Sequence, residues 1–479
     1  MSDAALDAMT DAPPLHYLTI AALAAEIEAC RLSPVDVAQH MLDRIEALDG
    51  KLNAYAAVMA DSAMAEARLA ESEIAAGRYR GKLHGVPVAV KDLCYTKGVA
   101  TKGGLKVLAD FVPDFDATVV ERFRAAGAVI LGKLNLTEGA MAGYNPDFPV
   151  PENPWRNGHW AGASSSGSCA ATAAGLAYAT LGSDTGGSIR HPAAVCGTVG
   201  LKPTYGLISR HGVLALAQTL DHVGPLTRSA VDAGIVTQAI AGHDPCDPTS
   251  LPDALPDLLG GVGLSIAGLR LGWDERYATE DMAPDFAAGV AAALQAMADL
   301  GAQIVPVTMP AKLREYLDAW QVICTAEAAD AHRAFFPSRA EDYGPWFREW
   351  LARGNAYSAK DYAAAHILRT ESNVALARTM ADVDVLLCPS TPRAAYSVPR
   401  DVYYGPIPAN RDPWTSRFTV PMNFAGIPTL TLPCGLSEDG MPLSFQFVGH
   451  HRSEALLVQL GAAHEGVTDW HRLHPPGWD

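Results

Sequence analysis

The chain has 479 residues, of which 49% are hydrophobic and 19% are charged, a composition typical of a globular protein with a sizeable core. Its 36 basic and 53 acidic residues give a formal net charge of −17. An acidic surface repels phosphate backbones and anionic membranes, so we expect no nucleic acid and no membrane among the partners.

Nothing in the sequence indicates export or membrane insertion. The opening stretch MSDAALDAMTDAPP lacks the basic and apolar regions of a secretory signal. The most apolar run, Ala170–Leu181, is shorter than the ~18 residues that a membrane span needs. The eight cysteines are widely spaced and form no CxxC pair, which is typical of reduced, mostly buried thiols. We therefore expect a cytoplasmic protein.

Helical periodicity dominates the first ~75 residues. Apolar positions recur at helical spacing over 18–30 and 36–48. Between these runs, Ser33, Pro34 and Asp36 form a helix start, with a capping serine, a proline in the first turn and an acid. We predict that 1–75 is a helical segment packed on a core formed by 76–479.

Short apolar runs follow at intervals along the rest of the chain. They lack strict alternation, which suits strands buried on both faces, and helical stretches separate several of them. They cover 85–90, 126–132, 177–183, 269–273, 302–307 and 382–390. Residues 427–449 predict two strands joined by a turn at Asp439–Gly440, and 452–466 predict a closing helix. The pattern predicts one large α/β/α layered domain around a mixed, mostly parallel twisted sheet.

Helical patterns rich in Trp and Tyr dominate from about 275 to 380. We interpret this stretch as a helix-rich insertion or cap on the same domain. Ordinary outer helices of the layered domain are an equally good interpretation of the same pattern.

Chemistry concentrates between Gly158 and Gly206. A serine cluster, GASSSGS, precedes an Ala/Gly-rich segment and the apolar run 177–183, which ends in the turn GSDTGGSIR. Ser188 in this turn can project its hydroxyl into a crevice at the end of a strand. The adjacent glycines allow backbone N–H groups to converge on an anion, as in an oxyanion hole. A turn that binds phosphate or carboxylate without chemistry is the alternative.

Lys91 ends the apolar run GVPVAVK. A lone lysine at a strand end is usually a surface residue. A buried one can lose its proton, because desolvation disfavours the ammonium form, and the neutral amine is then a base. Serine needs such a base to become a nucleophile. Lys91, the serine cluster and Ser188 therefore form a possible catalytic set.

The stretch GASSSGSCAATAAG followed by GSDTGGSIRHPAAVCGTVGLKPTYG resembles the amidase signature family. HGVPVAVKD, GKLNLTE, NPW, LDHVGPLTRS and PMNFAGIPTLTLPCG match family segments in the same order over most of the chain. The resemblance implies a Ser–cis-Ser–Lys triad of Ser188 as nucleophile, Ser164 as bridge and Lys91 as base. The residue before the bridging serine is commonly glycine in this family, whereas here it is Ala163.

The resemblance also implies roles around the triad. The oxyanion hole would be formed by the backbone N–H groups of Thr185, Gly186, Gly187 and Ser188. The acyl site would be bordered by Gly139, Ala140, Met141 and Tyr144. Asp184 and Arg190 would support the nucleophile turn by an ion pair, with contact between Arg190 and an acidic substrate as the alternative. The remaining hydroxyls, Ser165, Ser166 and Ser168, would start the helix and support the site.

Three other motifs are weaker. Residues 127–133, GAVILGK, imitate a phosphate loop, but Leu134 follows in place of a hydroxyl residue, so we predict a strand. The pair His450–His451 lacks further ligands at metal spacing. His191 is placed for a Ser–His–Asp triad, yet the family assigns it no role. We expect no metal and no cofactor.

The leading hypothesis is a serine-type amidase that hydrolyses the C–N bond of small or hydrophobic carboxamides through an acyl-enzyme on Ser188. Anilides, esters and carbamates extend the range of expected substrates. The expected partner is a small-molecule amide substrate, and the protein is expected to be a monomer or homodimer. The A subunit of a tRNA-dependent amidotransferase shares the motifs, although residues 145–155 lack the serine- and asparagine-rich stretch expected of it. A non-catalytic binding protein on the same fold is the third hypothesis.

Overall fold

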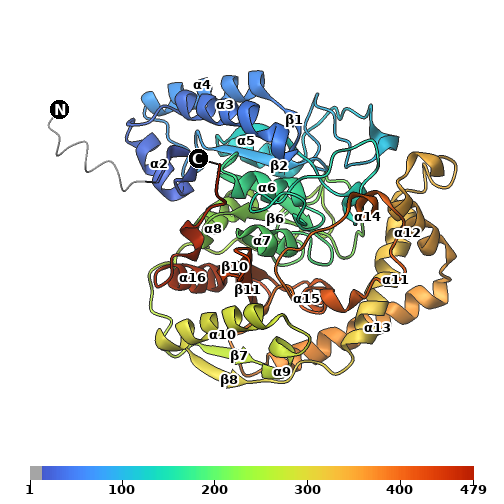
Figure 1. Ribbon diagram of the computed structural model, residues 1–479. Coiled ribbons are helices and arrows are strands. Elements are labelled where there is room, and N and C mark those ends of the chain that lie inside the picture. The colour runs from blue at the N-terminus through green and yellow to red at the C-terminus, as the bar shows by residue number, and fades with distance from the viewer. Residues whose placement is uncertain (1–12, 479) are drawn as a thin grey trace.

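A mixed sheet of eleven strands runs through the computed structural model, which describes residues 13–478 (Figure 1). Most of the opening stretch MSDAALDAMTDAPP lies outside the described residues. The strand order is β1-β3-β2-β4-β6-β5-β10-β11-β9-β7-β8. The strands are β1 (Tyr55–Val58), β2 (Pro87–Lys91), β3 (Val129–Leu134), β4 (Ala179–Asp184), β5 (Val199–Lys202), β6 (His222–Thr227), β7 (Arg270–Trp273), β8 (Gln303–Pro306), β9 (Val385–Pro389), β10 (Thr429–Leu436) and β11 (Pro442–Gly449).

The prediction of a mixed sheet in an α/β domain is confirmed, but the expectation that most strand pairs are parallel is wrong. Within the described residues, four neighbouring pairs are parallel and six are antiparallel. Helices cover the antiparallel centre on both faces, so its strands are buried along nearly their whole length, as parallel strands usually are. The predicted hairpin is present, with β10 and β11 joined through the turn at Asp439–Gly440.

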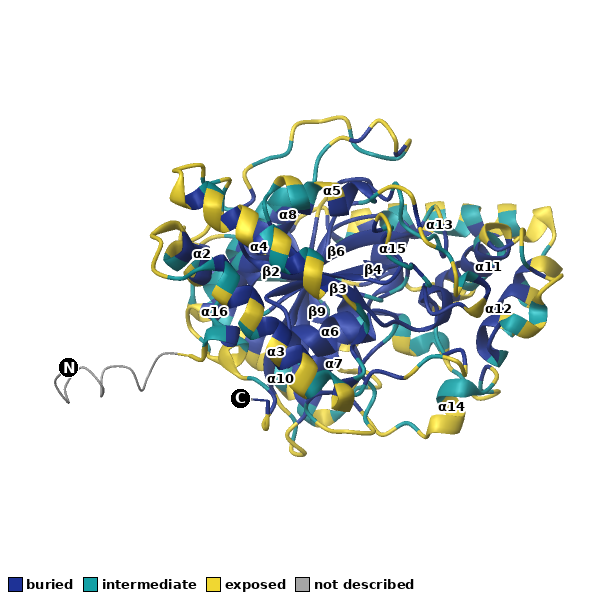
Figure 2. Ribbon diagram, turned by 90° about the horizontal axis from the view of Figure 1, so that it is seen from above, coloured by how far each residue is buried: buried dark blue, intermediate teal, exposed yellow. Residues whose placement is uncertain are grey.

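Helices cover both faces of the sheet. Figure 2 shows the buried strands at the centre, with α6 and α7 on one side and α5 and α8 on the other. The α-helices are α2 (Ile20–Glu28), α3 (Pro34–Leu52), α4 (Ala60–Ala75), α5 (Thr118–Ala125), α6 (Ser166–Ala173), α7 (Arg190–Cys196), α8 (Ala230–Ile240), α9 (Glu275–Thr279), α10 (Pro284–Asp299), α11 (Leu313–Ala331), α12 (Pro345–Ala356), α13 (Ala359–Thr379), α14 (Arg400–Tyr404), α15 (Val420–Ala425) and α16 (Glu454–Glu465).

The N-terminal helices form where the local signals place them. The Ser33 hydroxyl accepts hydrogen bonds from the N–H groups of Val35 and Asp36, and Pro34 occupies the first turn of α3. The segment also contributes β1, which pairs with β3 at the edge of the sheet. The helix-rich stretch from 275 to 380 likewise contains β8, which pairs with β7. The domain boundaries drawn from the sequence remain a prediction.

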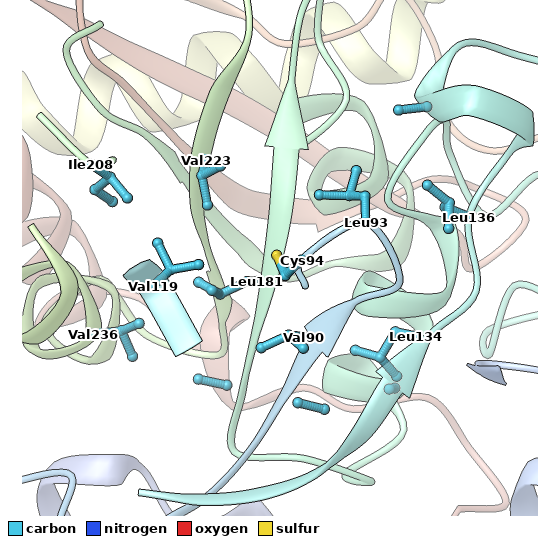
Figure 3. Packing of buried hydrophobic residues seen from close by; sticks show 14 of the residues in the cluster. Val90, Leu93, Cys94, Val119, Leu134, Leu136, Leu181, Ile208, Val223 and Val236 are labelled. Carbon is cyan, nitrogen blue, oxygen red and sulfur yellow. The ribbon is translucent and has the colours of Figure 1, made fainter. Parts of the chain in front are cut away.

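The core that supports the site lies around the parallel strands β2 and β4. Figure 3 shows Val90, Leu181 and Val223 of β2, β4 and β6 packing with Val119 of α5 and Val236 of α8. Because β2 and β4 are parallel neighbours, their carboxyl ends lie at the same edge of the sheet. The topology therefore brings the ends of β2 and β4 together.

Two further expectations concern the whole chain. All eight cysteines are free, and six of them are buried, as predicted for reduced thiols. Within residues 13–478, no helix combines the length and the apolar character that crossing a membrane requires.

Candidate active site

Lys91 lies at the end of β2 and is completely buried. Its Nζ is 2.7 Å from the Ser164 Oγ and 2.9 Å from the Oγ atoms of both Ser165 and Ser183. Burial lowers the pKa of Lys91 from its ordinary value of 10.5 to about 7. Its three hydrogen-bonding partners are neutral hydroxyls, so no carboxylate of the described residues contacts the amine to offset its desolvation.

The serine cluster around α6 divides into distinct positions. Ser164 precedes the helix and follows a cis peptide bond with Ala163. The Ser165 N–H donates to the Ser188 carbonyl oxygen at 3.3 Å, which joins the cluster to the turn that carries Ser188. The Ser166 hydroxyl is 2.9 Å from the Tyr144 hydroxyl. Ser168 donates to the carbonyl of Leu181 at 2.9 Å and is not among the hydroxyls that contact Lys91.

Asp184 organises the turn that carries Ser188. Its carboxylate accepts from the Arg190 side chain at 2.8 and 3.0 Å and from Asn423 Nδ2 at 2.9 Å. Burial opposes ionisation, but the Arg190 guanidinium, together with Lys202 and the Asn423 amide, outweighs it and holds the pKa of Asp184 well below its usual range. Both residues are fully buried, so Arg190 is committed to this ion pair. The geometry agrees with the supporting role.

The predicted oxyanion hole needs one correction. The Gly187 N–H donates to Asp184 Oδ1 at 2.8 Å, so it is not available to an oxyanion in this arrangement. Within the described part of the chain, the N–H groups of Thr185, Gly186 and Ser188 donate to no protein acceptor. These three groups remain candidates, whereas Gly187 shapes the turn.

Two glycines of the turn are required by close packing. A Cβ on Gly186 would lie 2.5 Å from the Trp320 ring. Gly187 has φ +135°, and a Cβ there would lie 2.6 Å from the ring of His191. The GG pair therefore lets aromatic side chains approach the backbone beside Ser188.

The ion pair gives a stability prediction. Arg190→Met should lower the free energy of unfolding by about 3–5 kcal/mol, because it leaves the Asp184 carboxylate buried and uncompensated. Urea denaturation followed by circular dichroism measures the change. Arg333→Met, which breaks an exposed pair with Asp330, is the matched control and should shift the midpoint little. Equal midpoints for the two variants would refute the supporting role.

Ser188 lines a cavity of about 500 Å³ at this edge of the sheet. Thr185 and Gly186 line it as well. Of the predicted acyl-site residues, Ala140, Met141 and Tyr144 also line it. Gly139 does not, because its backbone packs against Phe347, where a Cβ would lie 2.4 Å from the ring. The loop after β3 thus borders the cavity, Gly139 does not line it, and the role of these residues at an acyl site stays a prediction.

The rest of the wall is aromatic and was missed by the sequence reasoning. It comes from Trp160 before α6, Trp320 of α11, Trp346 of α12, and Tyr396 and Tyr403 of the segment after β9. Trp320 also donates its indole N–H to the Thr185 carbonyl at 2.9 Å, which ties α11 to the turn that carries Ser188. The concentration of Trp and Tyr between about 275 and 380 is a sequence signal for Trp320 and Trp346, but not for Trp160, Tyr396 and Tyr403.

The weaker motifs have structural explanations. Lys133 of GAVILGK ends a buried strand segment and pairs with Asp92 at 3.0 Å. The His450 Nε2–H donates to the Val383 carbonyl near β9 at 2.9 Å. His191 lines the cavity, and burial lowers its pKa to about 4. No group of three metal-binding side chains occurs within residues 13–478.

Comparisons with known proteins extend over nearly the whole chain. The sequence model of the Amidase family matches residues 36–458. AmiD of Mycobacterium tuberculosis, a protein named as an amidase, is 42% identical over 479 residues, covering 99% of each chain. The A subunit of glutamyl-tRNA(Gln) amidotransferase from Chloroflexus aurantiacus is 38% identical, covering 96% of this chain and 99% of that protein. The solved structure of 6-aminohexanoate cyclic dimer hydrolase complexed with substrate has a TM-score of 0.86 at 28% identity, covering 97% and 100% of the two chains.

The fold and these relatives define a class, that of hydrolases acting on carbon–nitrogen bonds. Within that class the chain belongs to the amidase family, with the family match covering most of its length. The family predicted from the serine and glycine motifs is therefore confirmed.

Proposed function

We propose that this chain is a serine-type amidase that hydrolyses small or hydrophobic carboxamides, with Ser188 as nucleophile, Ser164 as bridge and Lys91 as base. The observation that carries the proposal is the buried Lys91 Nζ, 2.7 Å from the Ser164 hydroxyl, beside the cavity that Ser188 lines. Anilides, esters and carbamates are further candidate substrates, because acyl-enzyme formation tolerates several leaving groups.

In the proposed first step, neutral Lys91 takes the Ser164 proton while Ser164 takes the Ser188 proton. The Ser188 oxygen bonds to the substrate carbonyl carbon, and the carbonyl oxygen becomes an oxyanion facing the N–H groups of Thr185, Gly186 and Ser188. Each such donor contributes roughly 3–4 kcal/mol to transition-state stabilisation.

In the second step, Lys91 and Ser164 return a proton to the substrate nitrogen, the C–N bond breaks, and an acyl-Ser188 ester remains. Water then attacks the ester, its proton enters the same relay, and the carboxylic acid leaves as Ser188 regains its hydrogen. The low pKa of Lys91 supports this cycle, because the amine must gain and lose a proton near neutral pH.

A substrate screen tests the proposal. Purified protein would be incubated with aliphatic amides, anilides, peptide amides, carbamates and glutamine. Hydrolysis of each class would be measured as the release of amine or ammonia. We expect turnover of at least one carboxamide class and covalent labelling of Ser188 by a serine-directed phosphonate, located by mass spectrometry. Labelling at another serine would refute the assignment.

The pH profile is a second expected result. Because burial lowers the pKa of Lys91 to about 7, the base form is lost as the pH falls through that value. kcat/KM should therefore fall below about pH 7, in proportion to the unprotonated fraction of Lys91, and level off above it. A profile without this limb would contradict the role of Lys91.

Glu138 needs a control, because it titrates in the same range. Burial raises its pKa to about 7, against hydrogen bonds from Asn145 and the Gly344 N–H. Glu138→Gln removes this titration and nearly keeps the shape and volume of the side chain. The limb should persist in this variant if Lys91 causes it, and disappear if Glu138 does.

The amidotransferase A subunit remains the second candidate function, supported by the relative at 38% identity. A subunit of that kind would release ammonia from glutamine. Glutamine hydrolysis exceeding that of the other amides, together with co-purification of a larger partner, would favour it over the free-standing amidase.

A further inference from the structure

Arg411 contributes an unpaired positive charge to the wall of the Ser188 cavity. It lies in the segment after α14, together with the cavity-lining residues Asn410 and Asp412. Its backbone N–H donates to the Pro408 carbonyl. Across residues 13–478, its half-buried guanidinium donates no hydrogen bond and forms no ion pair. A guanidinium has five N–H donors, and here they have no protein acceptor.

Other arginines in the interior do not share this property. Arg190 pairs with Asp184, and Arg417 donates to main-chain carbonyls that include that of Glu280. Arg369 donates to the hydroxyl and carbonyl of Thr219. A partly desolvated charge without a partner is costly, so the exception at Arg411 calls for an acceptor that the chain itself does not provide.

Nearby charges do not compensate Arg411. Asp412 also lines the cavity, but its carboxylate accepts from the Trp414 N–H at 2.9 Å and lies 3.5 Å from Arg314. Glu349 is engaged by Arg353 at 2.6 Å. Burial, and then repulsion from Arg353, lower the pKa of Arg411, yet an arginine stays charged at neutral pH. The cavity wall therefore keeps a positive charge although the chain carries −17.

The position of the guanidinium is supported from one side. Arg411 Cζ lies 5.9 Å from the ring centroid of Trp350, a fully buried residue of α12, within the range of cation–π attraction. The packed indole holds the charge at the wall without using its N–H groups. This is an arrangement suited to recognising a planar anion.

We propose that Arg411 binds a carboxylate of the substrate, so that the preferred substrates are amides carrying a free carboxylate away from the scissile bond. A guanidinium and a carboxylate can form two parallel N–H···O bonds, which would satisfy Arg411 and orient the amide toward Ser188. The inference rests on the proposed amidase function, because the preferred substrates are amides. The preference for a negative charge is argued from the cavity alone.

Binding to the Ser188→Ala variant, measured by calorimetry, tests the charge preference without turnover. Two carboxylate ligands would be used: succinanilate, with the carboxylate on the acyl side, and N-phenylacetylglycine, with it on the amine side. Their neutral partners carry an isopropyl group in place of the carboxylate. We expect at least one carboxylate ligand to bind about tenfold or more tightly than its neutral partner.

Arg411 variants then assign the preference. Arg411→Gln in the same background should abolish the discrimination, with Kd for the neutral ligand unchanged within about threefold, and Arg411→Lys should keep part of it. Arg393→Gln is the matched control, since Arg393 is an exposed arginine of the same cavity that lies over the Tyr396 ring. Because solvent screens the charge of Arg393, its loss should change the discrimination between charged and neutral ligands little.

Two outcomes would overturn the inference. One is equal affinity for charged and neutral ligands in the Ser188→Ala background. The other is an equal loss of discrimination in Arg393→Gln and Arg411→Gln, which would indicate a diffuse field rather than a specific contact. Either can occur while wild-type protein still hydrolyses neutral amides through Ser188, so this failure is separate from failure of the proposed function.

Discussion

Ser188→Ala should reduce kcat for any amide substrate by about 10⁵-fold or more, because it removes the oxygen that forms the acyl bond in the proposed mechanism. The cavity, the Asp184–Arg190 pair and the candidate oxyanion donors would remain, so KM should change little. Steady-state kinetics on the carboxamide class identified by the screen measures the loss. Circular dichroism should show an unchanged fold.

A neighbouring serine gives the matched control for this prediction. Ser168 is as buried as the cluster around Lys91, but its hydroxyl donates to the Leu181 carbonyl. Ser168→Ala should keep turnover within a few-fold, since it leaves the relay intact. The kcat of Ser164→Ala should lie between those of Ser188→Ala and Ser168→Ala, because this variant interrupts the proposed proton transfer and keeps the proposed nucleophile. Substantial turnover in Ser188→Ala would remove the basis of the proposed mechanism.

Local chemistry explains which parts of the fold were predictable. The strands β2, β3, β4, β7, β8, β9, β10 and β11 each lie in or overlap a short run rich in apolar residues, so the local hydrophobic pattern identified them. The strands β1, β5 and β6 were missed. Each is short or interrupted, as with Gly224 and Pro225 in β6, and its strand form depends on pairing with neighbours far along the chain. Strand order likewise depends on long-range pairing that no local pattern encodes.

The candidate site likewise has parts that local sequence patterns indicate and parts that depend on the tertiary structure. Lys91, Ser164 and Ser188 were predicted because a strand end, a serine cluster and a glycine turn mark them locally and by family resemblance. The commitment of the Gly187 N–H to Asp184 depends on how the turn closes, which composition does not reveal. The aromatic wall and Arg411 come from α11, α12 and the segment after β9, whose approach to the cavity is a tertiary property.

Lys91→Met should lower kcat/KM by about 10³–10⁴-fold and remove the limb of the pH profile near pH 7. Methionine has nearly the length of lysine and suits a buried position, so the change removes the base without opening a large cavity. The variant should be at least as stable as the wild type, because it relieves the desolvation of an amine that has only hydroxyl partners. Combined with Ser188→Ala, it should add little further loss, since both residues serve one relay.

Lys202→Met separates the chemical role from the effect of removing any buried lysine. Lys202 is also fully buried in the sheet, at the end of β5, and its Nζ donates to the carbonyls of Ile427 and Pro203 at 2.6 and 3.1 Å. Its loss should lower stability, because those carbonyls lose their donor, while the pH limb of kcat/KM persists. If Lys91→Met kept the limb, or Lys202→Met lost it, the base would have to be sought elsewhere. The distinction depends on the partners of each amine: the carbonyl oxygens around Lys202 can only accept a hydrogen bond, whereas the Ser164 hydroxyl can exchange a proton with Lys91.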